Sequence, residues 1–240
     1  MDFLYNYKYR GDILKTKVLL VEDEESIRKF VKINLEREGY TIFEAGSGEE
    51  GIEIARRELP DIVVLDIMLP GIDGFEVCKT LRGEFPSLGI IMLTAKAEDY
   101  DKIMGLQYGT DDYLTKPFNP TELTLRIKSI ERRLEIGEEN ESNLITDPPF
   151  KIDSYSRKFY KDDVELELTP TEYQIIKIFM TNPGKAMTRN EILKLVWGDD
   201  FLGDSKIVDV NIRRLRSKIE TNPAKPDYIE TVWGTGYRWK

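Results

Sequence analysis

Five short runs of apolar residues recur through the first half of this 240-residue chain, and each is followed by a segment with helical spacing. The runs occupy residues 17–23, 41–45, 61–66, 89–95 and 112–117. Several are nearly continuous in Val, Ile and Leu, which is typical of strands that are covered on both faces. After the first run, Ile27, Val31 and Leu35 repeat every four residues, as on one side of a helix. This alternation predicts an α/β fold with a doubly wound, parallel five-stranded sheet.

The second half of the chain has a different pattern. Residues 150–168 alternate between polar and apolar side chains around a turn, which predicts short antiparallel strands. Residues 169–172 and 188–191 both fit the capping box that begins a helix, and Asp204–Ser205 begins a third. The chain closes with two β-rich halves around Gly-Thr-Gly at 228–239, which is a hairpin signal. Three helices and a terminal hairpin indicate a winged helix, an α+β fold.

Composition and charge separate the two halves. A stretch rich in Glu, Asn and Ser, which ends in two prolines, interrupts both patterns and predicts a linker. The expected segments are an N-terminal extension, an α/β domain, the linker and a winged helix, at residues 1–16, 17–134, 135–149 and 150–240. The net charge of the chain is −9, but residues 145–240 contain 16 Lys and Arg against 15 Asp and Glu. The second half therefore remains compatible with nucleic acid.

Two residue types that support many enzyme and metal sites are nearly missing. The chain contains no His and a single Cys, Cys78, which excludes His-based nucleophile pairs, His-bearing zinc or haem sites and a disulfide framework. No apolar run approaches the ~18 residues of a membrane span, and the start lacks the layout of a signal peptide. We therefore expect a cytoplasmic protein without membrane contact, whose chemistry depends on carboxylates, Lys, Ser, Thr or a hard cation.

Polar side chains stand where the predicted strands end. They are Glu22, Asp23, Asp66, Thr94 and Lys116. In an open parallel sheet, ligands bind beyond the carboxyl ends of the strands. Carboxylates that meet there repel one another, and a hard divalent cation such as Mg²⁺ relieves the repulsion. A carboxylate at such a metal can attack a phosphoryl group, while a nearby ammonium and hydroxyl hold the transferred oxygens. Any one of these signals alone is more typical of a helix cap or a surface turn.

The segments VEDEE, VVLDIMLPGIDG, IIMLTA and DDYLTKPF resemble the four signatures of the CheY-like receiver domain, in the family's order and spacing. The resemblance covers residues 17–133. It implies that Asp66 is the phosphoacceptor and that Glu22 and Asp23 are the metal-binding acids. It also implies that Mg²⁺ is ligated directly by Asp23, Asp66 and the main-chain carbonyl of Met68.

The same resemblance implies a switch. Thr94 and Lys116 would move to meet the phosphoryl group, and Tyr113 would turn inward into the space that Thr94 leaves. The bond between Lys116 and Pro117 is typically cis in this family. Residues 98–133 would provide the face through which two phosphorylated receivers form a homodimer. The expected ion pairs across that face are Lys102 with Glu122 and Asp112 with Arg126.

Residues 205–220 carry an amphipathic and basic helical pattern. Val208, Ile212, Leu215 and Ile219 lie within about 40° of one stripe, so this side should face the core. The opposite side contains Lys206, Val210, Arg213 and Ser217. Arg on an exposed helix can read guanine in the major groove, and other cations can bind phosphates. A solvated amphipathic helix is the alternative for this segment taken alone.

The segments LTPTEYQII, VDVNIRRLRSKI and TVWGTGYRW resemble the winged-helix effector domain of the OmpR/PhoB type. The resemblance implies a recognition helix at 205–219, a wing at 228–239 and a loop at 197–203 that is available to RNA polymerase. The candidate DNA contacts are Lys206, Val210, Asn211, Arg213, Arg214, Arg216, Ser217, Lys218, Thr231, Trp233 and Tyr237. Two positions depart from the family: Asn211 stands where His is frequent, and Trp233 stands where the wing commonly has an Arg that enters the minor groove.

Together the two resemblances imply a phosphorylation-activated transcriptional regulator of a two-component system, with a sensor histidine kinase and DNA as partners. The receiver would catalyse only its own phosphotransfer and autodephosphorylation, so no other enzyme activity is expected. One alternative is a Mg²⁺ phosphohydrolase of the haloacid-dehalogenase kind, which needs a second acid where this chain has Met68. Another is a DNA-binding protein whose receiver is only a dimerisation scaffold, and the intact Asp66, Thr94 and Lys116 argue against it.

Overall fold

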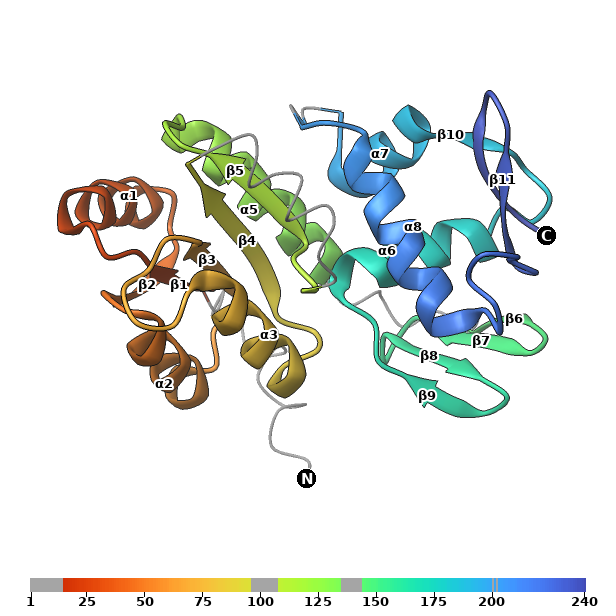
Figure 1. Cartoon of the computed structure of the whole chain (residues 1–240), viewed down its shortest axis with the longest axis horizontal. Helices are drawn as coiled ribbons and strands as arrows, with labels where there is room; N and C mark the ends of the chain where they lie inside the picture. Colours follow the sequence, from red (N-terminus) through yellow and green to blue (C-terminus); the bar gives the residue numbers. More distant parts are fainter. Residues whose placement is uncertain (1–14, 96–107, 135–143, 200, 202) are drawn as a thin grey trace.

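The computed structural model describes residues 15–95, 108–134, 144–199, 201 and 203–240. Within these residues the chain forms an α/β domain followed by a winged-helix domain, which lie side by side (Figure 1). None of the helices in the described part is long and apolar enough to cross a membrane.

The first domain is built on a five-stranded sheet. The strands are β1 (Lys17–Val21), β2 (Thr41–Ala45), β3 (Ile62–Asp66), β4 (Gly89–Thr94) and β5 (Asp112–Thr115). They pair in the order β2-β1-β3-β4-β5, and every described pairing is parallel. The residues of β3 and β4 are all buried, as expected for Val- and Ile-rich strands that are covered on both faces. The doubly wound sheet predicted from the sequence is confirmed.

Helices cover both faces of this sheet. They are α1 (Glu25–Arg37), α2 (Gly48–Glu58), α3 (Gly74–Glu84) and α5 (Pro120–Leu134). One apolar cluster joins α1 and α5 to the sheet through residues such as Val31 and Ile127. A second cluster joins α2 and α3 to the opposite face through residues such as Ile52 and Val77. The segment between β4 and β5, residues 96–107, lies outside the described residues, as does most of the N-terminal extension.

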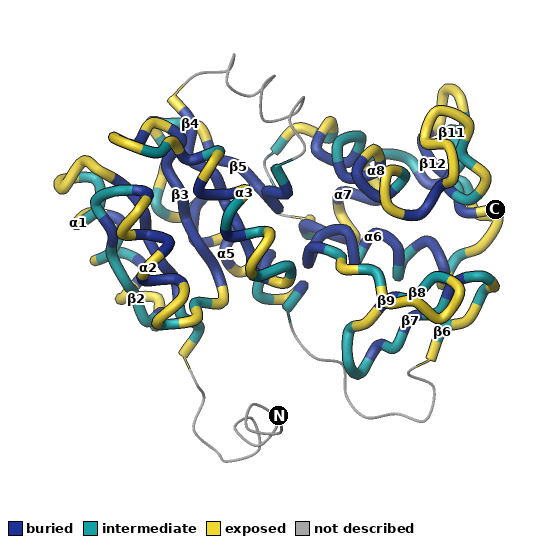
Figure 2. Tube along the Cα trace, turned by 60° about the horizontal axis from the view of Figure 1, so that its bottom comes forward, coloured by how far each residue is buried: buried dark blue, intermediate teal, exposed yellow. Residues whose placement is uncertain are grey.

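The described part of the second domain contains a four-stranded antiparallel sheet, three helices and a three-stranded sheet (Figure 2). The first sheet consists of β6 (Leu144–Asp147), β7 (Phe150–Asp153), β8 (Lys158–Lys161) and β9 (Val164–Leu166). The helices are α6 (Pro170–Met180), α7 (Arg189–Trp197) and α8 (Lys206–Ile219). The last sheet has the order β10 (Met187–Thr188), β12 (Gly236–Trp239) and β11 (Ile229–Val232). Both predicted capping boxes are present, at the starts of α6 and α7, and the winged helix is confirmed.

The second domain starts earlier than the sequence pattern predicts. Strand β6 lies inside the expected linker at 135–149 and pairs antiparallel with β7. It is tied to the end of the chain, because Trp239 Nε1 donates a 2.6 Å hydrogen bond to Asp147 Oδ2. The strand escapes the sequence pattern because only Leu144 and Ile145 are apolar and a Glu- and Asn-rich segment precedes them. Residues 135–143 lie outside the described part of the chain.

Candidate functional site

The acidic residues at the strand ends come together as the sequence predicts. Carboxylate oxygens of Glu22, Asp23 and Asp66 lie within 4.8 Å of one another. Glu22 and Asp66 are only 1% and 4% exposed, whereas Asp23 is open to solvent. Lys116, just beyond β5, brings its ammonium to the same place, and Nζ donates hydrogen bonds of 2.7 Å to both Glu22 and Asp66. The topology explains this convergence, because parallel strands end at one edge of the sheet.

The charges of this cluster are unbalanced. Burial raises the pKa of Glu22, the neighbouring Asp66 adds to the rise, and the hydrogen bond from Lys116 only partly opposes it. Burial alone would lower the pKa of Lys116, but its hydrogen bonds to Asp66 and Glu22 carry it above the ordinary value. Three carboxylates thus face one ammonium in a small volume. An oxygen-rich, net negative site of this kind fits a hard divalent cation such as Mg²⁺.

Main-chain contacts hold the cluster in shape. Met68, whose carbonyl is a predicted metal ligand, donates its N–H to Asp66 Oδ1 at 3.2 Å, and its side chain points into solvent. Two contributors escape the sequence analysis. The guanidinium of Arg28 donates to the carbonyl of Glu22. Gly74 begins α3 so close to Asp66 that a Cβ there would lie 2.1 Å from the carbonyl oxygen of Asp66. A Gly after Asp73, the helix cap, is the sequence signal for this close approach.

The residues of the predicted switch lie on β4 and β5. Thr94 is fully buried at the end of β4, and its main-chain carbonyl accepts the N–H of Lys116 at 2.7 Å. The Lys116–Pro117 bond is cis, as expected. Tyr113 is 7% exposed and packs against the apolar cluster of α2 and α3. Its expected movement on phosphorylation stays a prediction.

The predicted dimer residues pair within one chain. Arg126 on α5 donates to Asp112 at 2.8 Å and to Glu122 at 2.7 Å. It is nearly buried, and its guanidinium lies 4.8 Å from the ring centre of Phe201 in the second domain. Asp112 and Arg126 meet within one chain because β5 and α5 are neighbours in the fold, and their expected pairing across two receivers stays a prediction. Lys102 lies outside the described residues.

Helix α8 orients its residues much as the periodicity predicts. The stripe of Val208, Ile212, Leu215 and Ile219 is buried. On the opposite side, Lys206, Arg213 and Ser217 are exposed, and Val210 is half-buried. This exposed side offers two cations to a groove or a phosphate.

Three other predicted DNA contacts are covered in this structure. Asn211 is buried and donates to the Ile207 carbonyl one turn earlier in the helix. Arg214 is 5% exposed, and its Nη1 donates to the carbonyl of Thr110 in the first domain at 2.7 Å. Tyr237 is buried, and its hydroxyl donates to Asp209 Oδ1 at 2.7 Å. Arg214 is covered because its flank of α8 faces the receiver rather than solvent.

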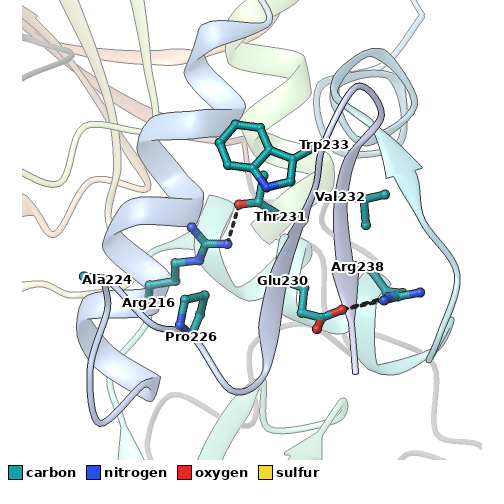
Figure 3. Close-up of a pocket in the computed structure, with 8 residues that line it drawn as sticks. All are labelled: Arg216, Ala224, Pro226, Glu230, Thr231, Val232, Trp233 and Arg238. Carbon is teal, nitrogen blue, oxygen red and sulfur yellow. Dashed lines mark hydrogen bonds and ion pairs between the residues drawn. The ribbon is translucent and has the colours of Figure 1, made fainter.

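Of the remaining candidates, Arg216 and Thr231 join the wing to α8, whereas Lys218 pairs with α6 and Trp233 is exposed. Arg216 of α8 donates to the hydroxyl of Thr231 (Figure 3). It also donates to the carbonyl of Ile229, so it fixes the wing to the helix. Lys218 donates to Glu172 Oε2 at 2.7 Å. Trp233, at the tip of the wing, is 91% exposed. The wing therefore presents an indole where a cation was expected from the family.

Family models match both domains of the chain. The response regulator receiver domain matches residues 18–128, and the transcriptional regulatory protein, C terminal, matches residues 163–239. The alkaline phosphatase synthesis transcriptional regulatory protein PhoP of Bacillus subtilis is 44% identical over 233 residues, which cover 94% of this chain and 97% of PhoP. The chain belongs to the OmpR/PhoB family of response regulators. It is thus a transcription regulator of the two-component type rather than a conventional enzyme, and its domains imply a histidine kinase and DNA as partners.

Two further comparisons agree with this assignment. The transcriptional regulatory protein AfsQ1 of Streptomyces coelicolor is 42% identical over 221 residues, which cover 92% of this response regulator and 96% of AfsQ1. A solved structure of a RitR mutant is 26% identical and superposes with a TM-score of 0.74, covering 94% of this chain and 99% of that one. The similarity to RitR extends over both domains at once.

Proposed function

We propose that a sensor histidine kinase activates this response regulator by phosphorylating Asp66. The observation that carries the proposal is the cluster at the strand ends. Its carboxylates lie within 4.8 Å of one another, and Lys116 Nζ reaches Glu22 and Asp66 at 2.7 Å. The same residues match the receiver signatures one position at a time.

The chemistry follows from these positions. A carboxylate oxygen of Asp66 attacks the phosphorus of a phosphohistidine, the phosphorus–nitrogen bond breaks, and the imidazole leaves. Glu22, Asp23, Asp66 and the main-chain carbonyl of Met68 would hold Mg²⁺, which would supply positive charge to the transferred oxygens. Lys116 already touches Asp66 and binds one of these oxygens, and the hydroxyl of Thr94 binds another after a shift from its buried position. Water then hydrolyses the acyl phosphate in autodephosphorylation.

DNA is bound by α8 and the wing of a homodimer. Arg213 projects from the exposed side of α8 and is the candidate for base contact, whereas Lys206 is placed for phosphate. A dimer presents two such helices to half-sites about one helical turn apart. The loop at 197–203, of which residues 200 and 202 lie outside the described part, is the candidate contact for RNA polymerase.

Receivers pair through the face of β5 and α5 when Asp66 is phosphorylated. Arg126, Asp112 and Glu122 already form a charged group on this face. Exposed ion pairs contribute only about 0–1 kcal/mol each, so several must act together with an apolar patch.

Intact-mass spectrometry with acetyl phosphate and Mg²⁺ tests the phosphorylation step. We expect one added phosphoryl group on the wild type and none on Asp66→Asn, which keeps the shape and removes the nucleophile. Excess EDTA should abolish the reaction. Full labelling of the variant, or of the wild type in EDTA, would count against this assignment. Rapid turnover of the donor with multiple release of phosphate would favour the phosphohydrolase alternative instead.

A further inference from the structure

A cationic side chain of α1 contacts the main chain of two of the clustered acids. The loop between β1 and α1, residues 22–24, carries the carboxylates of Glu22 and Asp23. Arg28, in the first turn of α1, donates from Nη1 to the carbonyl of Glu22 and, at 3.3 Å, to the carbonyl of Asp23. One guanidinium therefore joins two consecutive carbonyls of this loop to the helix.

Main-chain hydrogen bonds hold the two ends of the loop. The N–H of Glu22 donates to the carbonyl of Ala45 on β2 at 3.1 Å, and the N–H of Arg28 donates to the carbonyl of Glu24 at 3.0 Å. Between these anchors Asp23 is exposed, and Glu24, the N-cap of α1, makes no capping hydrogen bond with its side chain. The guanidinium contact thus falls on the part of the loop that lies between the two main-chain anchors.

Glu44 on β2 fixes this guanidinium and offsets its charge. Its Oε1 lies 3.8 Å from Nε of Arg28, and its Oε2 accepts a hydrogen bond from Lys32, one turn further along α1. The side chains of Arg28 and Glu44 are 18% and 27% exposed, so water screens their charges only in part. A lone cation beside a cation site would repel Mg²⁺. Because Glu44 offsets that repulsion, the carbonyl contacts remain as the main effect of Arg28 on the site.

We propose that Arg28 is a positioning residue that sets the affinity of the acidic cluster for Mg²⁺. It holds the loop so that the carboxylates of Glu22 and Asp23 stay within 4.8 Å of Asp66, and Glu44 keeps it in place. In a looser loop these like charges would move apart, and the metal would have to draw them together before it binds. Contacts that orient metal ligands in this way typically contribute roughly 10- to 100-fold to metal affinity. The inference rests on the proposed role of the cluster as a Mg²⁺ site.

Arg28→Lys tests the positioning role at constant charge. Lys keeps the positive charge but has no planar fork of donors, so it cannot reproduce the contacts of the guanidinium. The probe is Mn²⁺, which prefers the same oxygen ligands as Mg²⁺, and the electron paramagnetic resonance signal of the free ion reports how much metal the full-length protein binds. We expect the dissociation constant to rise about 10-fold. Asp66→Asn, titrated in parallel, measures binding elsewhere on this acidic chain.

Glu44→Gln is a second variant in case Arg28→Lys does not fold. It leaves Arg28 in place and removes the acid that holds its guanidinium, so the dissociation constant should rise in the same direction but less. Lys32→Gln removes a charge beside the same acid without touching the carbonyl contacts, and it is the control that should bind the metal like the wild type. The titrations are made in high KCl, which screens the exposed charges, and circular dichroism in EDTA shows which variants are folded.

The rate of phosphorylation separates positioning from direct contact with the phosphoryl group. With acetyl phosphate as the donor, Arg28→Lys should need about 10-fold more Mg²⁺ for its half-maximal rate. It should reach the wild-type rate when Mg²⁺ is saturating, because the residues that contact the phosphoryl group are intact. A purely structural role of Arg28 would lower the stability of the receiver without changing the Mg²⁺ requirement.

The outcomes separate this inference from the proposed function. Weaker metal binding in the folded variants, together with an unchanged rate at saturating Mg²⁺, supports it. An unchanged dissociation constant in Arg28→Lys and Glu44→Gln overturns it. A lower saturating rate with an unchanged dissociation constant also overturns it and would place Arg28 on the phosphoryl group instead. If the wild type binds no more Mn²⁺ than Asp66→Asn does, the metal site of the proposed function fails and this inference falls with it.

Discussion

Replacing Glu22 with Gln should stabilise the receiver in EDTA and weaken its response to Mg²⁺. The substitution keeps the size of a side chain that is 1% exposed and removes one of three clustered charges. At an effective dielectric constant of about 20, two charges 4.8 Å apart repel by about 3.5 kcal/mol, and the 2.7 Å contact to Lys116 attracts by about 6 kcal/mol. Keeping a carboxylate out of water costs several kcal/mol more.

Repulsion and desolvation together exceed the attraction, which agrees with the raised pKa of Glu22. We therefore expect the free energy of unfolding of Glu22→Gln in EDTA to be about 1–2 kcal/mol higher than that of the wild type. Saturating Mg²⁺ should reverse this order, because a ligand at 100 times its dissociation constant adds about 2.7 kcal/mol to the wild type. The variant has lost a proposed metal-binding acid, so Mg²⁺ should add less to its free energy of unfolding.

Urea unfolding by circular dichroism measures both effects. Because the three tryptophans all lie in the second domain, fluorescence follows that domain separately, and the difference between the two signals belongs to the receiver. Glu84→Gln, which removes an exposed acid paired with Arg56, is the control and should not alter the Mg²⁺ response. A variant that is less stable than the wild type in EDTA, or that gains as much from Mg²⁺, would refute this account of the cluster.

Three further predictions concern the dimer and DNA. Arg126→Glu should abolish the phosphorylated dimer in light scattering and cost about 3–5 kcal/mol of stability, because it leaves a buried acid unpaired; an unchanged dimer would reject this face. Arg213→Ala should lower the DNA-binding free energy by ~1–3 kcal/mol and relax the sequence preference at one base position. Lys206→Ala should weaken binding to all DNA sequences alike and lower the slope of the salt dependence by about one. The opposite pattern of effects would exchange the roles of the two residues. Trp233→Arg should strengthen binding and steepen its salt dependence, and weaker binding at an unchanged slope would show that the indole packs against sugar or protein.

Local patterns predict much of this molecule. The sequence predicts the strands, the two capping boxes and the polar residues at the strand ends, because each depends on neighbours within a few positions. The sheet topology then brings Glu22, Asp66 and Lys116 together. The sequence also predicts which side of the basic helix is buried and which is exposed, since burial of Val208 and exposure of Arg213 follow from periodicity alone.

Local sequence patterns do not predict the contact between the domains. Arg214 differs from Arg213 by one position, and its burial depends on Thr110, which lies 104 positions earlier. Periodicity places Arg214 only on a flank of the helix and does not say that another domain covers that flank. Tyr237 likewise lies within the last β-rich segment, and only its hydrogen bond to Asp209 shows that it faces α8. The pairing of Arg126 with Asp112 was predicted, but not that it forms within one chain.

We propose that phosphorylation of Asp66 controls DNA binding. The DNA affinity of the wild type and of Asp66→Asn is measured by mobility shift in Mg²⁺ with and without acetyl phosphate, on samples whose phosphorylation is known from intact mass. We expect the wild type to bind more tightly in proportion to its phosphorylated fraction and the variant to show no response. A fully phosphorylated wild type with unchanged affinity, or an equal response in Asp66→Asn, would contradict the claim.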